Sequence, residues 1–155
     1  MDRIEKIRAV MDGVLLEITD EKERQNAAVH LYGVSQYCAM LAMKRGEDVE
    51  LAVIAGMMHD IYSYSAMETK DHAHKGAEMA RGILISMDAF SDQEVEQICS
   101  AVYHHSSKRK VHAALDEVLK DADVLAHCLY HPGLEVVDKE KKRWDDLKKE
   151  LGLIS

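Results

Sequence analysis

The chain has 155 residues, a length that favours one domain over two. Pro occurs once and Gly eight times while 47% of the residues are apolar, which excludes collagen-like and low-complexity chains. The net charge of −8 repels phosphate backbones and argues against binding of bulk nucleic acid. We expect a cytoplasmic protein without membrane contact for three reasons. The three Cys form no CxxC pair, the charged N-terminus lacks a signal peptide, and no apolar stretch is long enough to cross a bilayer.

Apolar residues recur at helical spacing and nowhere alternate strictly, which predicts an all-α bundle of about six to seven helices. In chain order, we expect helices over about residues 2–18, 20–45, 49–59, 72–86, 92–105, 113–130 and 138–150. A polar loop is expected around residues 63–65 and a basic loop at 106–110. The expected domain spans residues 1–155, with a core at about 27–129 flanked by the helices 2–18 and 138–150.

Local signals support several of these boundaries. Thr19 or Asp20 caps the second helix and Gly46 ends it, while Ser91 and Glu94 form a capping box. Residues 51–58 are apolar on every face, which predicts a central, buried helix. The last helix alternates Lys with acids and is expected to be a solvated outer helix.

Four His and Asp residues lie where a polar group is costly to bury. His59 and Asp60 directly follow the all-apolar segment, His30 lies on an apolar stripe, and Asp123 lies in an otherwise apolar helix. Taken singly, Asp60 could cap the next turn and each His could be a hydrogen-bonded core residue. Together, imidazoles and carboxylates suit a divalent Fe, Mn, Co, Ni or Zn ion in an open, catalytic type of site.

In order along the chain, His30, His59-Asp60 and Asp123 resemble the H…HD…D motif of the HD superfamily of metal-dependent phosphohydrolases. The flanking sequences AVHLYGV at 28–34, AGMMHDI at 55–61 and ADVL at 122–125 resemble the family's as well. The resemblance implies a helical bundle that holds one or two ions through these four residues. It also implies a metal-activated water, a catalytic role for Asp60, and a small phosphorylated substrate such as a nucleotide.

Further His residues resemble those of the two-metal members of the superfamily. His72 matches the His of a His-x-x-x-Gly-Ala element, and His104 and His105 resemble a His pair. The resemblance implies that these three hold a second metal or position the phosphate. The alternatives are a helix start for His72 and a solvent-facing helix end for His105. His127, four residues after Asp123, shares its helix face but has no counterpart in the motif, so a ligand, a supporting residue and an ordinary His all stay open.

Two departures from the family pattern bear on activity. Many HD enzymes have HD-x-x-Lys, whose Lys can contact phosphate, but Ser63 stands at this position. Lys108 and Arg109, in the basic loop, could supply the missing cation and bind the phosphate; the alternative is a solvated loop. Tyr62 replaces the Gly of the cyclic-dinucleotide branch and no Gly-Tyr-Pro is present, which argues against that branch.

The leading hypothesis is therefore a metal-dependent phosphohydrolase that acts on a nucleotide or another small phosphate ester. The alternative is a non-catalytic metal- or nucleotide-binding module on the same scaffold, which Ser63 and an aromatic content of only 5% favour. A metal-free helical interaction domain would leave the inward-facing polar residues unexplained. The apolar first helix leaves room for a homodimer.

Overall fold

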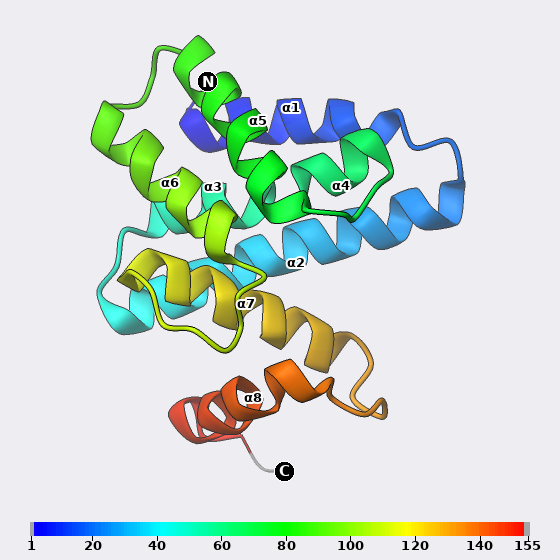
Figure 1. Cartoon of the computed structure of the whole chain (residues 1–155), viewed down its shortest axis with the longest axis vertical. Helices are drawn as coiled ribbons and strands as arrows, with labels where there is room; N and C mark the ends of the chain where they lie inside the picture. The colour runs from blue at the N-terminus through cyan, green and yellow to red at the C-terminus, as the bar shows by residue number, and fades with distance from the viewer. Residues whose placement is uncertain (1, 154–155) are drawn as a thin grey trace.

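The computed structural model describes residues 2–153, which form eight helices and no strand (Figure 1). The elements are α1 (Arg3–Leu16), α2 (Glu21–Arg45), α3 (Val49–Met58), α4 (Ile61–Ala66), α5 (His72–Ser86), α6 (Asp92–His104), α7 (Ala114–Tyr130) and α8 (Asp138–Leu151). The predicted all-α fold is confirmed. Within these residues, no helix combines the length and the apolarity that crossing a membrane requires.

The short helix α4 was not predicted, because the sequence suggested a polar loop around residues 63–65. Ile61 at its start is fully buried, and the Tyr64 amide donates to the Asp60 carbonyl at 3.2 Å. Ser63 is half-buried and Ser65 is exposed. The polar serines gave the loop signal, and tertiary burial of Ile61 outweighs it.

The predicted caps are present at most helix ends. Asp20, and not Thr19, caps α2 by accepting from the Glu23 amide at 2.8 Å, and Gly46 ends that helix at φ 74°. Positive φ there suits glycine, which has no Cβ to clash. The capping box of Ser91 and Glu94 at the start of α6 is also present.

The helix α3 is the centre of the bundle, as its apolar sequence predicted. It packs against α1, α2, α6 and α7, and every residue from Leu51 to Met58 except Val53 is buried. Its closest approach to α2 is at Gly56, where an added Cβ would lie 2.8 Å from Ser35 Cα. The glycine therefore sets the spacing of the helices that carry His30 and His59.

Gly56→Ala is expected to lower the free energy of unfolding by about 2–3 kcal/mol, because a methyl group would collide with the α2 backbone. For a chain of this size the loss corresponds to a melting temperature lower by about 5–10 °C, measurable by thermal unfolding. Gly82→Ala is the matched control, since a Cβ there has no atom within 4 Å. That variant should be unchanged or slightly more stable; equal behaviour of the two variants would contradict the argument.

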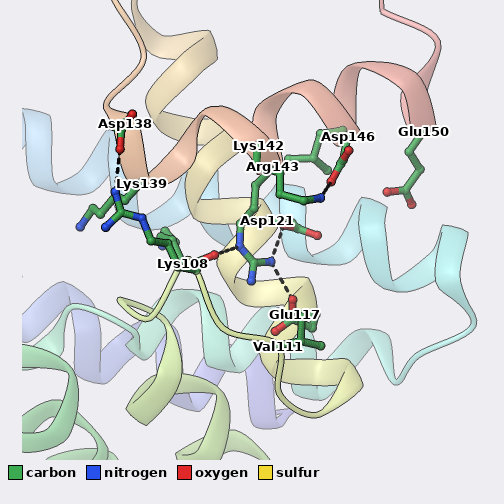
Figure 2. A pocket seen from close by; sticks show the side chains of 12 residues that line it. Lys108, Val111, Glu117, Asp121, Asp138, Lys139, Lys142, Arg143, Asp146 and Glu150 are labelled. Carbon is green, nitrogen blue, oxygen red and sulfur yellow. Dashed lines mark hydrogen bonds and ion pairs between the residues drawn. The ribbon is translucent and has the colours of Figure 1, made fainter.

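The last helix is mostly exposed, as predicted, but it also ties the α6–α7 loop to the bundle. Arg143 of α8 donates to the carbonyl oxygens of Lys108 and Lys110 at 2.6 and 2.8 Å, and it pairs with Glu117 and Asp121 of α7 (Figure 2). A cleft of about 450 Å³ lies between these elements. Its charged lining residues mostly pair with one another, so it offers few free groups to a ligand.

Candidate metal centre

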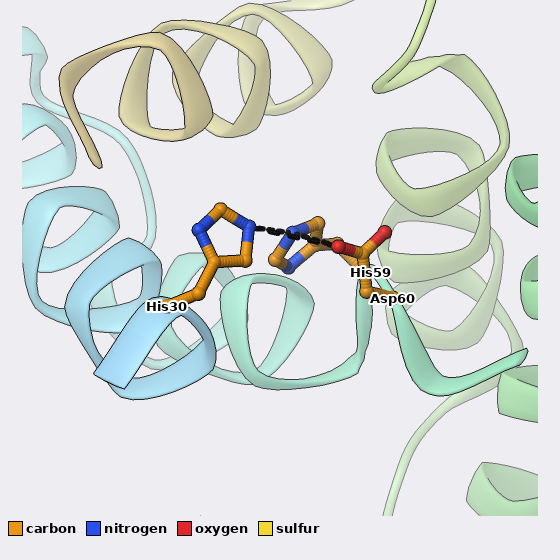
Figure 3. A group of neighbouring side chains, drawn as sticks. All are labelled: His30, His59 and Asp60. Atoms are coloured by element: carbon orange, nitrogen blue, oxygen red, sulfur yellow. Dashed lines mark hydrogen bonds and ion pairs between the residues drawn. The ribbon is translucent and has the colours of Figure 1, made fainter. Parts of the chain in front are cut away.

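Two helices and the turn after α3 bring His30, His59, Asp60 and Asp123 together. His30 lies within α2, His59 and Asp60 follow the last residue of α3, and Asp123 lies within α7. Figure 3 shows the His30 ring and the Asp60 carboxylate turned toward one another, with His59 between them in that view. The donor atoms of His59 and Asp60 lie close to that of His30, and Asp123 lies close to both histidines, although these residues are far apart in the sequence.

The donor atoms of these side chains face one another across short gaps. His30 Nε2 lies 3.1 Å from His59 Nε2 and 3.2 Å from Asp123 Oδ1. Asp60 Oδ2 lies 3.2 Å from His59 Nε2 and 3.6 Å from His30 Nε2, while His59 Nε2 is 3.7 Å from Asp123 Oδ1. Ligand atoms placed about 2.1 Å from one ion are themselves about 3.0–3.4 Å apart, so these spacings suit a shared divalent cation.

The imidazoles are oriented by hydrogen bonds on the nitrogen that faces away from the centre. Nδ1 of His59 donates to the Gly56 carbonyl at 2.7 Å, and Nδ1 of His105 donates to the Val102 carbonyl at 2.7 Å. A carbonyl only accepts, so Nδ1 carries the proton and Nε2 of the neutral ring keeps its lone pair. This is the usual support for a metal-ligating histidine.

Asp60 is placed between two groups of donors. Its Oδ2 faces His30 and His59, while its Oδ1 lies 3.4 Å from His72 Nε2 and 3.3 Å from His105 Nε2. His72 and His105 are in turn 3.1 Å apart through their Nε2 atoms. The carboxylate of Asp60 makes no capping hydrogen bond to α4, so the simple capping interpretation of this residue is wrong.

An unpaired buried atom also points to a cation at this centre. Asp123 is 5% exposed, and its Oδ1 has no hydrogen-bond partner among the described residues. The other oxygen, Oδ2, accepts from Lys108 Nζ at 2.6 Å. Because an unsatisfied buried carboxylate oxygen is costly, a cation shared with His30 and His59 would account for it.

The pKa values show that the centre is built to hold ionised carboxylates. Burial by itself raises the pKa of Asp60, but the surrounding imidazoles, His59 foremost, hold it well below the usual range. Burial also opposes ionisation of Asp123, but Lys108 and the neighbouring imidazoles together outweigh it, so that the pKa of Asp123 is again low. Burial lowers the pKa of His30, yet the two carboxylates raise it to about 9. The centre therefore attracts a cation, for which a proton on His30 competes.

His104 does not join either donor group, in contrast to the expectation for it. Its Nδ1 lies 2.8 Å from Asp116 Oδ2, and its ring is stacked on His112. The reason is helical geometry, because adjacent residues at the end of α6 differ in direction by about 100°. His105 continues the buried face that Ile98 and Val102 form. This helical spacing could have shown from the sequence that His105 points inward and His104 does not.

Lys108 and Arg109 have other partners than the expected phosphate. Lys108 is buried, and its ammonium group donates to Asp123 and to the His105 carbonyl, both at 2.6 Å. Arg109 is exposed and pairs with Asp138 at the surface. Lys108 thus stabilises a candidate ligand, and Arg109 is a solvated residue, as the alternative interpretation held.

A second cleft opens directly beside the centre. It measures about 410 Å³ and lies between α2, α7 and the α7–α8 loop. His30 and His127 line its inner end, and Tyr37, Tyr130 and Leu134 are among its other walls. An apolar cleft that reaches a group of metal donors is a typical place for a small ligand.

A family model for the HD domain matches residues 28–127. The chain belongs to the HD domain family. The matched range contains both donor groups and ends before α8, so the resemblance that the motifs suggested is confirmed.

Comparison with individual proteins supports the same assignment. The HD domain chain is 31% identical over 126 residues to ribonuclease Y of Lawsonia intracellularis and 29% identical over 126 residues to that of Geobacter metallireducens. These alignments cover 80% and 81% of the chain but 22% of each relative, so the chain spans about a fifth of their length. A solved structure described as a predicted HD superfamily hydrolase from an uncultured Thermotogales bacterium shares the fold. Its TM-score is 0.65 at 21% identity, over 96% of this chain and 88% of that one.

Proposed function

We propose that this HD domain is a metal-dependent phosphohydrolase. The observation that carries the proposal is the position of Asp60, whose two oxygens face His30 and His59 on one side and His72 and His105 on the other. With Asp123, these residues would hold one or two divalent ions. A bound ion would polarise a phosphoryl oxygen and lower the pKa of a coordinated water toward neutrality.

The chain's own residues set the charge and the shape around the phosphate. Asp60 and Asp123 are kept ionised, and Lys108 neutralises the outer oxygen of Asp123, which limits the negative charge that an incoming phosphate meets. Lys108 thereby supplies part of the positive charge that the family Lys would bring at the position of Ser63. It does so through its ion pair with Asp123 and not by contacting the phosphate.

The cleft between α2 and α7 supports a small phosphate ester, for example a nucleotide, as the substrate. Its volume of about 410 Å³ is in the range of pockets for small ligands, and Tyr37 and Tyr130 give it aromatic walls. The name of the relatives suggests RNA as a second class. The net charge of −8 weighs against a long RNA strand, so we favour the small ester.

The basic test combines metal analysis with a panel of substrates. Purified protein should contain Mn, Fe, Co, Ni or Zn, and it should hydrolyse members of a panel of nucleotides, sugar phosphates and short oligoribonucleotides. Activity on the oligoribonucleotides alone would favour the RNA class. Bound metal without turnover on the whole panel would favour the non-catalytic binding module, and absence of metal under every preparation would overturn both.

Gly33→Leu should raise KM by about 10-fold or more while kcat and metal content change little. Gly33 lines the cleft, and a Cβ there has no atom within 4 Å, so a larger side chain fills the cleft without straining the core. The leucine side chain would displace a part of the substrate of similar size, and burial of an apolar group of that size contributes about 1.5–3 kcal/mol to binding. Steady-state kinetics on the best substrate of the panel provides the measurement.

Gly13→Leu is the matched control for the filled cleft. Gly13 lies on the exposed face of α1, where a Cβ also has no atom within 4 Å. Its kinetics should equal those of the wild type. A Gly33→Leu variant with unchanged KM would show that the substrate does not use this cleft.

A further inference from the structure

His127 of α7 lies beside the candidate metal centre, although it has no counterpart in the H…HD…D motif. Its Nε2 is 3.4 Å from Asp123 Oδ1. Its ring is stacked on that of His30, with centroids 5.1 Å apart and planes 7° from parallel. One donor atom each of His30, Asp123 and His127 lies within 4.8 Å of the other two. The imidazole is therefore placed to reach a cation that His30 and Asp123 share.

The opposite nitrogen of His127 is held by a buried carboxylate. Glu140 of α8 is 2% exposed, and its Oε1 accepts from His127 Nδ1 at 3.0 Å. A buried carboxylate is costly unless it is paired, so an acid on the inward face of α8 needs this contact. His59 and His105 use backbone carbonyls in the same way, to direct Nε2 toward the centre. A carboxylate partner additionally makes the imidazole a stronger donor.

We infer that His127 is a further nitrogen donor to the ion held by His30 and Asp123, and that Glu140 is its positioning residue. The inference rests on the proposed function, since it presupposes a cation at this centre. The unpaired Asp123 Oδ1 supports it, because His127 Nε2 is closer to that atom than His59 Nε2, at 3.4 against 3.7 Å. Glu140 lies in α8, outside the matched residues 28–127, whereas His127 is the last residue of the match.

Titration of metal-free protein with Co²⁺ tests the inference without measuring activity. Calorimetry gives the affinity, and the visible absorption of Co²⁺ reports its coordination geometry and changes when a ligand is lost. His127→Ala should weaken binding of the tighter ion by about 100-fold and change the spectrum. Glu140→Gln should weaken it by about 10-fold, since loss of a supporting partner typically costs 10–100-fold in affinity. His127 is only half buried, so the alanine variant should fold, which its melting curve checks.

Two variants control for nonspecific effects on the same elements. Asp138→Asn removes an exposed carboxylate from α8, and His131→Ala removes a neighbouring His that lines the cleft. Both should bind Co²⁺ like the wild type. Unchanged affinity and spectrum in His127→Ala, with binding lost in His30→Ala, would overturn this inference and leave the proposed function intact. A wild type that binds no Co²⁺ would overturn both.

Discussion

Asp60→Asn is expected to lower hydrolysis by about 100- to 1000-fold and to remove most of the bound metal. The two oxygens of the carboxylate face both donor pairs, His30 with His59 and His72 with His105. The amide keeps the volume but loses the charge, and removing one preorganised electrostatic group typically costs about 10²–10³ in rate. Turnover and metal stoichiometry, measured beside the wild type, give the result.

The stability of the metal-free Asp60→Asn variant should be equal to or lower than that of the wild type. The imidazoles around Asp60, His59 foremost, hold its pKa well below the usual range, so the ionised carboxylate stabilises the fold and the neutral amide loses this contribution. Asp48→Asn is the matched control, since Asp48 caps the other end of α3 by accepting from the Leu51 amide at 2.9 Å, and Asn caps equally well. Full activity with unchanged metal in Asp60→Asn would be fatal to the proposed centre.

His105→Ala and His104→Ala should differ sharply although the residues are adjacent. His105 is buried, and its Nε2 faces Asp60 Oδ1 at 3.3 Å, so its loss should reduce activity by about 100-fold and empty the His72 side of the centre. His104 lies against Asp116 instead, and its loss should leave kcat/KM and metal content within about twofold of the wild type.

Thermal unfolding should show the opposite order, with the loss of stability in His104→Ala. His104→Ala leaves the buried Asp116 carboxylate without its imidazole partner, so the melting temperature should fall by a few degrees, from a loss of about 1–2 kcal/mol. If His104→Ala abolished activity and His105→Ala did not, the assignment of the pair would have to be reversed.

Most of the fold was predictable from local signals, because the longer helices carry an apolar period and several of them carry a start or stop signal. Asp20, Gly46 and the Ser91–Glu94 box act within a few residues of where they stand, so their effects can be read without knowing the neighbours. The helix α4 shows the limit of this reasoning. Its six residues are stabilised by burial of Ile61 against other helices, and a single polar turn carries no periodicity that reveals this.

The residues of the candidate site were predictable where a family motif and an apolar surrounding sequence mark the same residue. They were less predictable where the packing of helices decides which way a side chain points. His30, His59, Asp60 and Asp123 each interrupt an apolar pattern, and this interruption marks them in the sequence alone. Whether a residue at a helix end points inward depends on the rotation of that helix about its axis, as His104 shows.

The partners of Lys108 and His127 depend on tertiary packing. Lys108 meets Asp123 across 15 residues, and His127 meets Glu140 across 13. Both contacts depend on how the α6–α7 loop and α8 fold back onto α7. Local residue spacing does not predict how these segments fold back onto α7. The sequence therefore suggested a free cation for phosphate at Lys108 and a solvated helix around Glu140.

The contacts that anchor the α6–α7 loop bear on how ions and small molecules would enter and leave the candidate centre. Moving this loop would separate Lys108 from Asp123 and break the two bonds from Arg143 to its backbone, so it is poorly suited to act as a gate. In the proposed enzyme, ions and products would therefore exchange where the centre meets solvent, at the side chains of His30 and His72, which are 21% and 26% exposed. The rate of release would then depend on what fills the cleft beside His30, and a slow-leaving product there would limit turnover even when the chemistry is fast.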